Sequence, residues 1–205
     1  MSALWRGAAP LLLASKSAAR RALLAAAGIP FDACDAMIDE RALEAPMREV
    51  GAGGAAIARE LAWKKALAVS AREPERLVLG ADQTLALGDR LFTKPAGRAE
   101  AAAQLAALSG KTHELHSAIC VARGGRVQFE AAPVARLTVR ALSAAFIAAY
   151  LDAAGAAILG SVGAYQLEGL GVHLFERIEG EHSVILGLPL PPLLEFLREE
   201  GSLLS

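Results

Sequence analysis

Residues 77–82, with the sequence LVLGAD, place a carboxylate directly after a run of apolar side chains. A short apolar run of this kind is typical of a buried strand. A carboxylate there is costly unless it lies at the exposed end of the strand or binds a cation. Because α/β proteins bind ligands at strand ends, Asp82 is a candidate functional residue. The alternative is that Asp82 is an ordinary turn residue, and this stretch alone does not decide between the two.

Strands and helices alternate outward from this stretch. Upstream, residues 11–14 (LLLA) predict a second buried strand, and residues 18–27 predict a helix that begins after Ser17. Residues 30–50 are interpreted as polar turn and extended chain. The other predicted elements are helices over 55–70, 98–108, 143–153 and 189–200, and strands over 114–122, 126–140 and 172–176. This order predicts an α/β fold with a mixed sheet flanked by helices.

The composition limits the class of protein that this chain belongs to. Of its 205 residues, 54% are hydrophobic and 21% are charged, which is typical of a globular protein. The net charge of −1 and the lack of a basic block argue against binding of long nucleic acid. Cys34 and Cys120 are too few for a disulfide framework, and no apolar run approaches the roughly 20 residues that span a bilayer. We expect a cytoplasmic protein with one domain over residues 1–205, or two lobes of that domain around a cleft.

Residues 14–21 (ASKSAARR) join the first predicted strand to the first predicted helix. Backbone N–H groups at a helix N-terminus are unpaired, so they attract phosphate. Ser15, Ser17, Lys16 and Arg20 can add hydrogen bonds assisted by charge. The segment therefore predicts a binding site on the scale of a nucleotide phosphate. The alternative interpretation is a serine N-cap followed by solvated arginines.

A lysine follows downstream of Asp82, in the dipeptide Lys94-Pro95. The residue before a proline is held extended, which fixes the backbone that aims the lysine side chain. A carboxylate and a lysine are the minimum for Mg²⁺-assisted phosphoryl chemistry, in which the metal and the lysine neutralise phosphate charge. The alternative is that Lys94 is an unremarkable surface residue.

Two glycine-rich segments suggest ligand contact. Residues 163–171 (GAYQLEGLG) contain glycines that permit positive φ and close approach of the backbone to a ligand, so this segment is a candidate wall of a base pocket. Glycine-rich turns are common, and the segment carries little weight by itself. Residues 51–54 resemble a dinucleotide-binding loop, but no apolar strand precedes them and the full spacing is missing.

Taken together, these stretches resemble the Maf family of nucleoside triphosphate pyrophosphatases. Six motifs of that family recur in order over nearly the whole chain. The matching segments are LLLASKSAARRALL (11–24), GADQ (80–83), KP (94–95), LSGKTH (108–113), GAYQLEGLG (163–171) and LGLPL (186–190). The chain departs from the pattern at Ala18, where the family has a proline.

The resemblance implies a mixed sheet with a deep central cleft, similar to inosine triphosphate pyrophosphatases. It also implies a divalent cation, Mg²⁺ or Mn²⁺, held by Asp82 with Glu40, and a homodimer. Asp82 matches the proton acceptor of the family. The positions that handle phosphate and metal in the family match Ser15, Arg20, Glu40, Lys65 and Lys94.

The implied reaction is hydrolysis of a nucleoside triphosphate to the monophosphate and pyrophosphate. In this hypothesis Asp82 orients or deprotonates a water molecule that attacks the α-phosphorus. Lys65, Lys94 and Arg20 then stabilise the leaving pyrophosphate. The implied cellular role is the removal of modified nucleotides before they are incorporated into nucleic acid.

Three positions that differ between branches of the family match Ala19, Gln83 and Glu168 here. Gln83 and Glu168 resemble the branch that acts on 7-methyl-GTP, whereas the dTTP/UTP branch has threonine and glutamine. A carboxylate can accept hydrogen bonds from both N1–H and the exocyclic amine of guanine. Ala19 departs from both branches, because it replaces a tryptophan or an arginine and cannot stack on a cationic base. The resemblance favours purine-type or modified triphosphates.

Two rival functions belong to other classes. One is a nucleotide-binding regulator of septum formation without significant turnover, which needs most of the same residues. The presence of Asp82, Lys94 and Lys65 together favours catalysis, because a protein that only binds nucleotide does not need them all. The other rival is a dinucleotide-dependent oxidoreductase, against which the missing strand–GxGxxG–helix unit counts.

Overall fold

The structure is a computed structural model that describes residues 3–205. Its helices and strands fall into two compact units, which are described separately. The first unit takes in the described chain up to Gln83, together with Ser117–Pro133 and His182–Ser205. The second unit comprises Thr84–His116 and Val134–Glu181. The expectation of a single Maf-like domain with a deep cleft stays a prediction.

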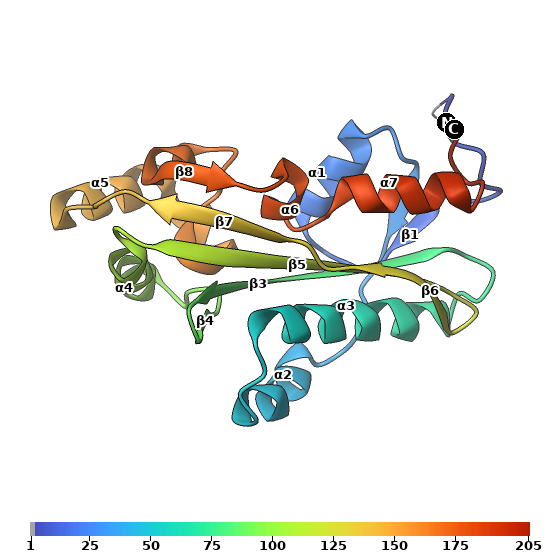
Figure 1. Ribbon diagram of the computed structural model, residues 1–205, viewed down its shortest axis with the longest axis horizontal. Coiled ribbons are helices and arrows are strands. Elements are labelled where there is room, and N and C mark those ends of the chain that lie inside the picture. Colours follow the sequence, from blue (N-terminus) through green and yellow to red (C-terminus); the bar gives the residue numbers. More distant parts are fainter. Residues whose placement is uncertain (1–2) are drawn as a thin grey trace. The chain divides into compact units, whose positions relative to one another are not determined.

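The described residues form one mixed sheet flanked by helices, as predicted (Figure 1). Its strands are β1 (Leu11–Leu13), β2 (Phe31–Ala33), β3 (Val78–Leu87), β4 (Arg90–Phe92), β5 (Thr112–Arg123), β6 (Arg126–Ala131), β7 (Val134–Val139) and β8 (Phe175–Glu179). Their order is β2-β1-β3-β5-β7-β8, with β4 paired to β3 and β6 paired to β5. Strands β3 and β5 contribute residues to both units.

Helices alternate with these strands along the chain. The α-helices are α1 (Ala18–Ala26), α2 (Glu40–Glu49), α3 (Gly54–Ser70), α4 (Arg98–Leu108), α5 (Ala144–Ala154), α6 (His182–Ile185) and α7 (Leu190–Glu199). Three 3₁₀ turns, η1 (Gly155–Gly160), η2 (Val162–Ala164) and η3 (Leu170–Leu174), lie between α5 and β8. None of the helices in residues 3–205 is long and apolar enough to cross a membrane.

The first unit is built on three parallel strands, with β1 between β2 and β3. Side chains alternate between the two faces of a strand, so the two faces of β1 and β3 have different partners. Leu11, Leu13 and Leu79 pack with residues of α1 and α7 on one face. Leu12 and Val78 pack against Val69 of α3 on the other. Both faces are covered, which explains why β1 and the first residues of β3 are apolar.

Helix α3 lies unusually close to the sheet because both surfaces carry small residues. A Cβ atom at Gly80 of β3 would lie 2.1 Å from the Ala62 carbonyl oxygen and 2.6 Å from the Ala66 nitrogen. Ala58, Ala62 and Ala66 repeat every fourth residue, so they form one stripe of the helix. This stripe packs on residues of β5, including Cys120. The close packing sets the distance between the α3 backbone and β3 at Gly80.

The second unit contains the antiparallel part of the sheet. β7 pairs with β8, with Leu137 opposite Ile178, and β5 pairs with β7, with His113 opposite Leu137. His113 is fully buried, and its Nε2 lies 2.7 Å from the Tyr165 hydroxyl. Its Nδ1 has no hydrogen-bond partner among the described residues. Burial therefore lowers the pKa of His113 to about 4, so this histidine is neutral in the folded protein at physiological pH.

We expect His113 to make stability depend on pH. The unfolded chain binds a proton near the ordinary pKa of 6.5, whereas the folded chain does so only near pH 4. The stabilisation is complete above pH 6.5 and is lost as the pH falls towards 4, to a total of about 3 kcal/mol. Urea unfolding of the His113→Asn variant should show a smaller loss between pH 7 and 4.5 than wild type. The exposed His173→Asn variant is the control and should behave like wild type.

Four sequence predictions about secondary structure are wrong. The predicted strand 172–176 is mostly the 3₁₀ turn η3, because the Val172 N–H bonds back to the Gly169 carbonyl, and β8 begins only at Phe175. β3 does not end at Asp82 but continues to Leu87, because Thr84, Leu85 and Ala86 are buried like the residues before Asp82. Residues 40–49 were predicted to be polar turn and extended chain, but they form helix α2, which Asp39 caps and in which no residue is buried. The predicted strand 126–140 is two strands, β6 and β7, because Pro133 cannot donate to the sheet.

Candidate active site

A buried ion pair joins α3 to β3 in the first unit. The Lys65 ammonium lies 2.6 Å from Oδ1 of Asp82, and both side chains are at least nine-tenths buried. The same ammonium lies 2.9 Å from Oε1 of Glu40, whose side chain is half exposed. Lys65 therefore brings two carboxylates, from β3 and from the first residue of α2, to one point. This arrangement brings together three residues that the family resemblance implies.

Local sequence explains how the three side chains reach that point. Lys65 lies next to Ala66, whose backbone touches Gly80, and Asp82 lies two residues beyond Gly80 on the same face of β3. The close packing of α3 therefore brings the lysine to the carboxylate. Helix α2 begins at Glu40 because Asp39 caps it, accepting a hydrogen bond from the Ala42 N–H at 3.1 Å.

Burial controls the electrostatics of Asp82. Loss of solvent raises the pKa of the Asp82 carboxyl above its ordinary value, and the positive charges of Lys65 and Arg20 oppose that shift. A carboxylate with a raised pKa binds a proton more readily than an exposed aspartate does. A buried carboxylate with specific charge partners is therefore suited to act as a general base.

Arg20 of α1 fixes a second positive charge in the first unit. Its Nη1 donates to the Ala81 carbonyl at 2.7 Å and to the Ser15 hydroxyl at 3.2 Å. Its Nε donates to the Gly187 carbonyl at 2.8 Å. Burial lowers the pKa of Arg20, and the carboxylates of Asp82 and Glu40 oppose that shift. The guanidinium thus reaches from α1 to β3, where it binds the carbonyl of Ala81, the residue before Asp82.

The serines before α1 have local roles. Ser17 is the N-cap of α1, and its hydroxyl accepts from the Arg20 N–H at 3.4 Å, as the N-cap interpretation predicts. The Ser15 hydroxyl accepts from the Ser17 N–H at 3.2 Å. Ala19 lies in the first turn of α1 and is partly exposed. The two serines shape the strand-to-helix junction, and Ser15 also joins that junction to Arg20.

Gln83 turns its amide nitrogen towards the protein. Its Nε2 donates to the Ser117 hydroxyl at 2.9 Å and to the carbonyls of Val184 and Ile185 at 3.0 Å each. An amide nitrogen has two hydrogens, so these three acceptors use both of them. Only the amide oxygen of Gln83 is left for another partner.

Lys94 and Glu168 lie in the second unit, and both are exposed. Sequence reasoning missed the residue that joins their two segments, Gln104 of α4. Its Nε2 donates to the Thr93 carbonyl at 2.9 Å, and its Oε1 accepts from the Gly163 N–H at 3.2 Å. The buried Gln104 therefore ties the Lys94 loop to the start of the glycine-rich segment. A lone glutamine in an alanine-rich helix was the only sequence signal for this role.

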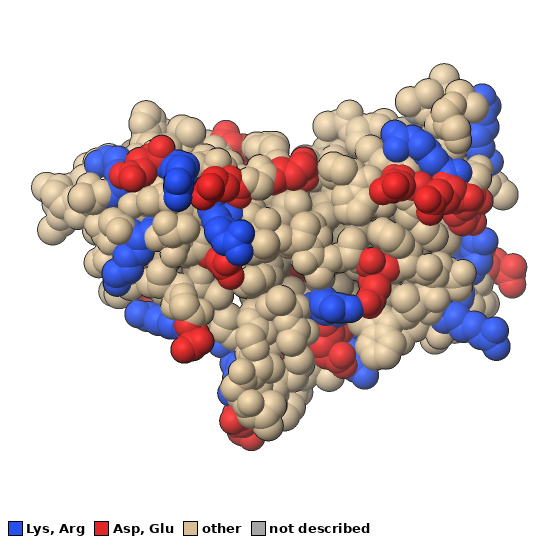
Figure 2. Space-filling view, viewed as in Figure 1, with Lys and Arg blue, Asp and Glu red and all other residues tan. Residues whose placement is uncertain are grey.

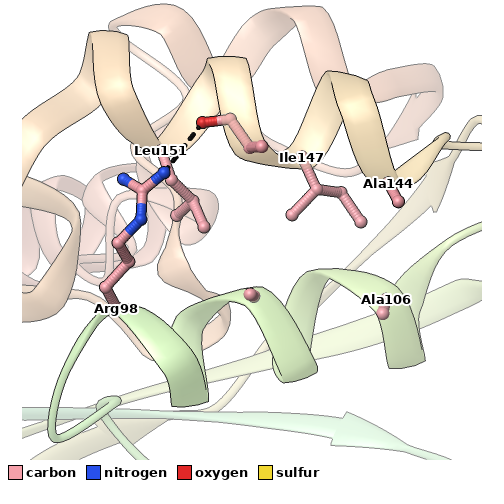
Figure 3. Close-up of a pocket in the computed structure, with 7 residues that line it drawn as sticks. Arg98, Ala106, Ala144, Ile147 and Leu151 are labelled. Atoms are coloured by element: carbon pink, nitrogen blue, oxygen red, sulfur yellow. Dashed lines mark hydrogen bonds between the residues drawn. The ribbon is translucent and has the colours of Figure 1, made fainter.

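An apolar groove between α4 and α5 of the second unit is a poor candidate for a nucleotide site (Figure 3). It is lined by Arg98, Ala102, Ala106, Ala144, Ile147, Ala148 and Leu151. Its one charged group is already paired, since Arg98 donates to the Ala148 carbonyl at 3.1 Å and lies 2.8 Å from Asp152. The groove offers no free charge to a phosphate.

Surface charge does not point to another site either. On the face drawn in Figure 2, Lys and Arg side chains are interspersed with Asp and Glu. Neighbouring surface charges form pairs, such as Lys64 with Glu60 at 3.4 Å. Exposed pairs of this kind contribute little energy. The buried charges around Asp82 are therefore the strongest candidate for chemistry.

The carboxylates of Asp82 and Glu40 suit a divalent cation. Mg²⁺ is usually bound through one or two carboxylates, with waters and substrate phosphates completing its shell. Over residues 3–205, no group of three or more His, Cys, Asp or Glu side chains gathers that could hold a metal ion by itself. Asp82 and Glu40 bring two carboxylates to one point, where both contact the Lys65 ammonium.

The fold and this site define a class: an α/β protein with a buried carboxylate, a lysine and an arginine arranged for phosphate chemistry. The chain belongs to the Maf family, since the family described as Maf-like protein matches residues 10–200. It is similar to a protein of Bradyrhizobium diazoefficiens named nucleoside triphosphate pyrophosphatase, with 60% identity over 202 residues and 96% of each chain covered.

Two further relatives carry related names. A Nitrobacter winogradskyi protein named nucleoside triphosphate pyrophosphatase is 57% identical, with 97% of each chain covered. A Rhizobium etli protein named 7-methyl-GTP pyrophosphatase is 54% identical, covering 94% of this chain and 97% of its own. The predicted membership of the Maf family is confirmed, and the predicted class of hydrolase agrees with these names.

Proposed function

We propose that this chain hydrolyses nucleoside triphosphates to nucleoside monophosphate and pyrophosphate. The observation that carries the proposal is the buried pair of Asp82 and Lys65, with Nζ and Oδ1 2.6 Å apart and Arg20 bound to the carbonyl of the preceding residue. The names of relatives at 54–60% identity over nearly their whole length support it. The chain is then a hydrolase acting on phosphorus-containing anhydrides.

In the proposed reaction Asp82 accepts a proton from the attacking water. The water oxygen bonds to the α-phosphorus, and the bond from that phosphorus to the α–β bridging oxygen breaks. Pyrophosphate carries the released electron pair away. The positive charges of Lys65, Arg20 and Lys94 stabilise the leaving pyrophosphate, and Lys65 does so from beside Asp82. Ser15 and Ser17 hold the junction at which the phosphates bind.

A divalent cation, Mg²⁺ or Mn²⁺, is part of this proposal. Asp82 and Glu40 would hold this cation. It supplies charge neutralisation at the phosphates when bound.

The proposed base preference rests on Glu168 and Ala19, because Gln83 can offer a base only its amide oxygen while its nitrogen is bonded within the protein. Glu168 supplies an acceptor for the N–H groups of a guanine edge, and Ala19 leaves room where other branches carry a large side chain. The similarity to the Rhizobium etli protein named 7-methyl-GTP pyrophosphatase supports purine-type or modified substrates. The cellular role is then removal of modified nucleotides. The homodimer and the cytoplasmic location stay predictions.

A substrate panel tests both parts of the proposal. Pyrophosphate release should be measured for canonical and methylated triphosphates, with Mg²⁺ and with Mn²⁺. We expect turnover that requires the cation and is fastest for 7-methyl-GTP or another purine-type substrate. If dTTP and UTP are the best substrates, the proposed base preference is wrong. Tight nucleotide binding without pyrophosphate release would instead support a regulator of septum formation.

A further inference from the structure

The position of Arg20 depends on a turn far away in the sequence. Its Nε donates to the carbonyl of Gly187, in the turn after α6, at 2.8 Å. Gly187 has a φ of 86°, which favours glycine, and a Cβ atom there would lie 3.5 Å from both Arg20 Nε and Gln83 Oε1. The turn therefore presents its carbonyl to the arginine from a backbone conformation that few other residues adopt.

Helix α6 has only four residues, His182–Ile185, and the turn after it is held partly by its own backbone. The N–H groups of Leu186, Gly187 and Leu188 donate to the carbonyls of His182, Val184 and Ser183 at 3.2, 3.1 and 2.9 Å. Side chains from the sheet add bonds at the last two carbonyls of the helix.

Gln83 of β3 and Ser117 of β5 supply those bonds. Gln83 Nε2 donates to the carbonyls of Val184 and Ile185, and the Ser117 hydroxyl donates to Val184 O at 2.6 Å. Gln83 Nε2 also donates to Ser117 Oγ at 2.9 Å, so the two side chains form one connected network. Ser117 is fully buried, and no solvent can replace its hydroxyl if it is removed.

We propose that Gln83 and Ser117 are positioning residues that fix the Arg20 guanidinium by holding the turn after α6. This inference rests on the proposed function, in which Arg20 neutralises substrate phosphate. It changes the role expected for Gln83, whose amide nitrogen serves the protein rather than the base. It also explains the motif LGLPL (186–190), because the turn in this motif presents the Gly187 carbonyl to Arg20.

A double-mutant cycle on turnover tests the coupling. Ser117→Ala and Gln83→Met should each lower kcat for pyrophosphate release about fivefold to tenfold, with a smaller change in KM. In an Arg20→Lys background the same substitutions should have almost no further effect, because the lysine side chain lacks the Nε–H that the turn positions.

Ser70→Ala is the matched control. Ser70 is also fully buried and accepts one backbone bond, from Gly125 N–H at 3.0 Å, so its loss should lower stability and leave kcat unchanged.

A spectroscopic measurement separates this inference from the proposed function. The Nε–H proton of Arg20 should exchange slowly with solvent in wild type, because it is bonded to Gly187 O. Its exchange should be at least about tenfold faster in Ser117→Ala, and unchanged in Ser70→Ala. Wild type without turnover but with this pattern would refute the proposed function alone. Unchanged Nε–H exchange in Ser117→Ala would overturn the positioning role. So would a double variant with Arg20→Lys in which the two losses of kcat multiply.

Discussion

The Asp82→Asn variant should lose at least about a hundredfold in turnover, because positioned general bases contribute factors of about 10² to 10⁴. An amide keeps the size of the side chain but cannot accept the proton of the attacking water. It also removes one of the two carboxylates proposed to hold the cation. Steady-state pyrophosphate release at saturating cation, compared with wild type, measures the effect.

The same variant should remain folded, which separates loss of chemistry from loss of structure. Burial raises the pKa of Asp82, so burial penalises the charged form, and a neutral amide removes that penalty. Lys65 keeps Glu40 as a partner at 2.9 Å. Loss of the closest carboxylate to the buried Lys65 opposes this gain, so we expect an unfolding midpoint in urea close to that of wild type. Asp89→Asn, at an exposed turn residue, is the matched control and should keep full activity. Turnover of Asp82→Asn close to that of wild type would exclude Asp82 as the base.

The Gly80→Ala variant should be destabilised by about 1–3 kcal/mol or more, the cost typical of overpacking. The new methyl group would lie 2.1 Å from a backbone oxygen of α3 and 2.6 Å from a backbone nitrogen, and neither can move without moving the helix. Moving α3 also displaces Lys65 from Asp82. Turnover should therefore fall together with stability. Pyrophosphate release measures the turnover, and urea unfolding measures the stability.

Gly160→Ala is the control for that substitution. A Cβ atom at Gly160 meets nothing within 4 Å, so the extra methyl group has open space. This variant should match wild type in both measurements. Wild-type stability of Gly80→Ala would mean that α3 does not pack on β3 as closely as described.

The sequence predicted the parts of the fold that depend on local pattern. The leucine run at 11–13 and the apolar residues before Gly80 form strands because both faces of these strands are buried. The N-cap at Ser17 could also be predicted, because its hydroxyl accepts a hydrogen bond from the Arg20 N–H only three residues away. The end of β3 could not be predicted, because the polar residues after Ala81 resemble a turn although the strand continues through them.

The site could be predicted only in part, because its contacts join distant segments. The carboxylate of Asp82 stood out beside an apolar strand, but Lys65 and Glu40 entered only through the family resemblance. Their meeting depends on the contact between α3 and Gly80, which no periodicity reveals. Ser117 gave no signal at all, because one serine in a strand-like run looks the same whether or not it bonds to a remote carbonyl.

Isotope labelling tests the central claim, hydrolysis between the α- and β-phosphates, most directly. Wild-type enzyme should be incubated with a nucleoside triphosphate and a divalent cation in water enriched in oxygen-18, and both products analysed by mass spectrometry. Attack at the α-phosphorus predicts one labelled oxygen in the monophosphate and none in pyrophosphate. Label in pyrophosphate, or release of orthophosphate in place of pyrophosphate, would contradict the proposed reaction.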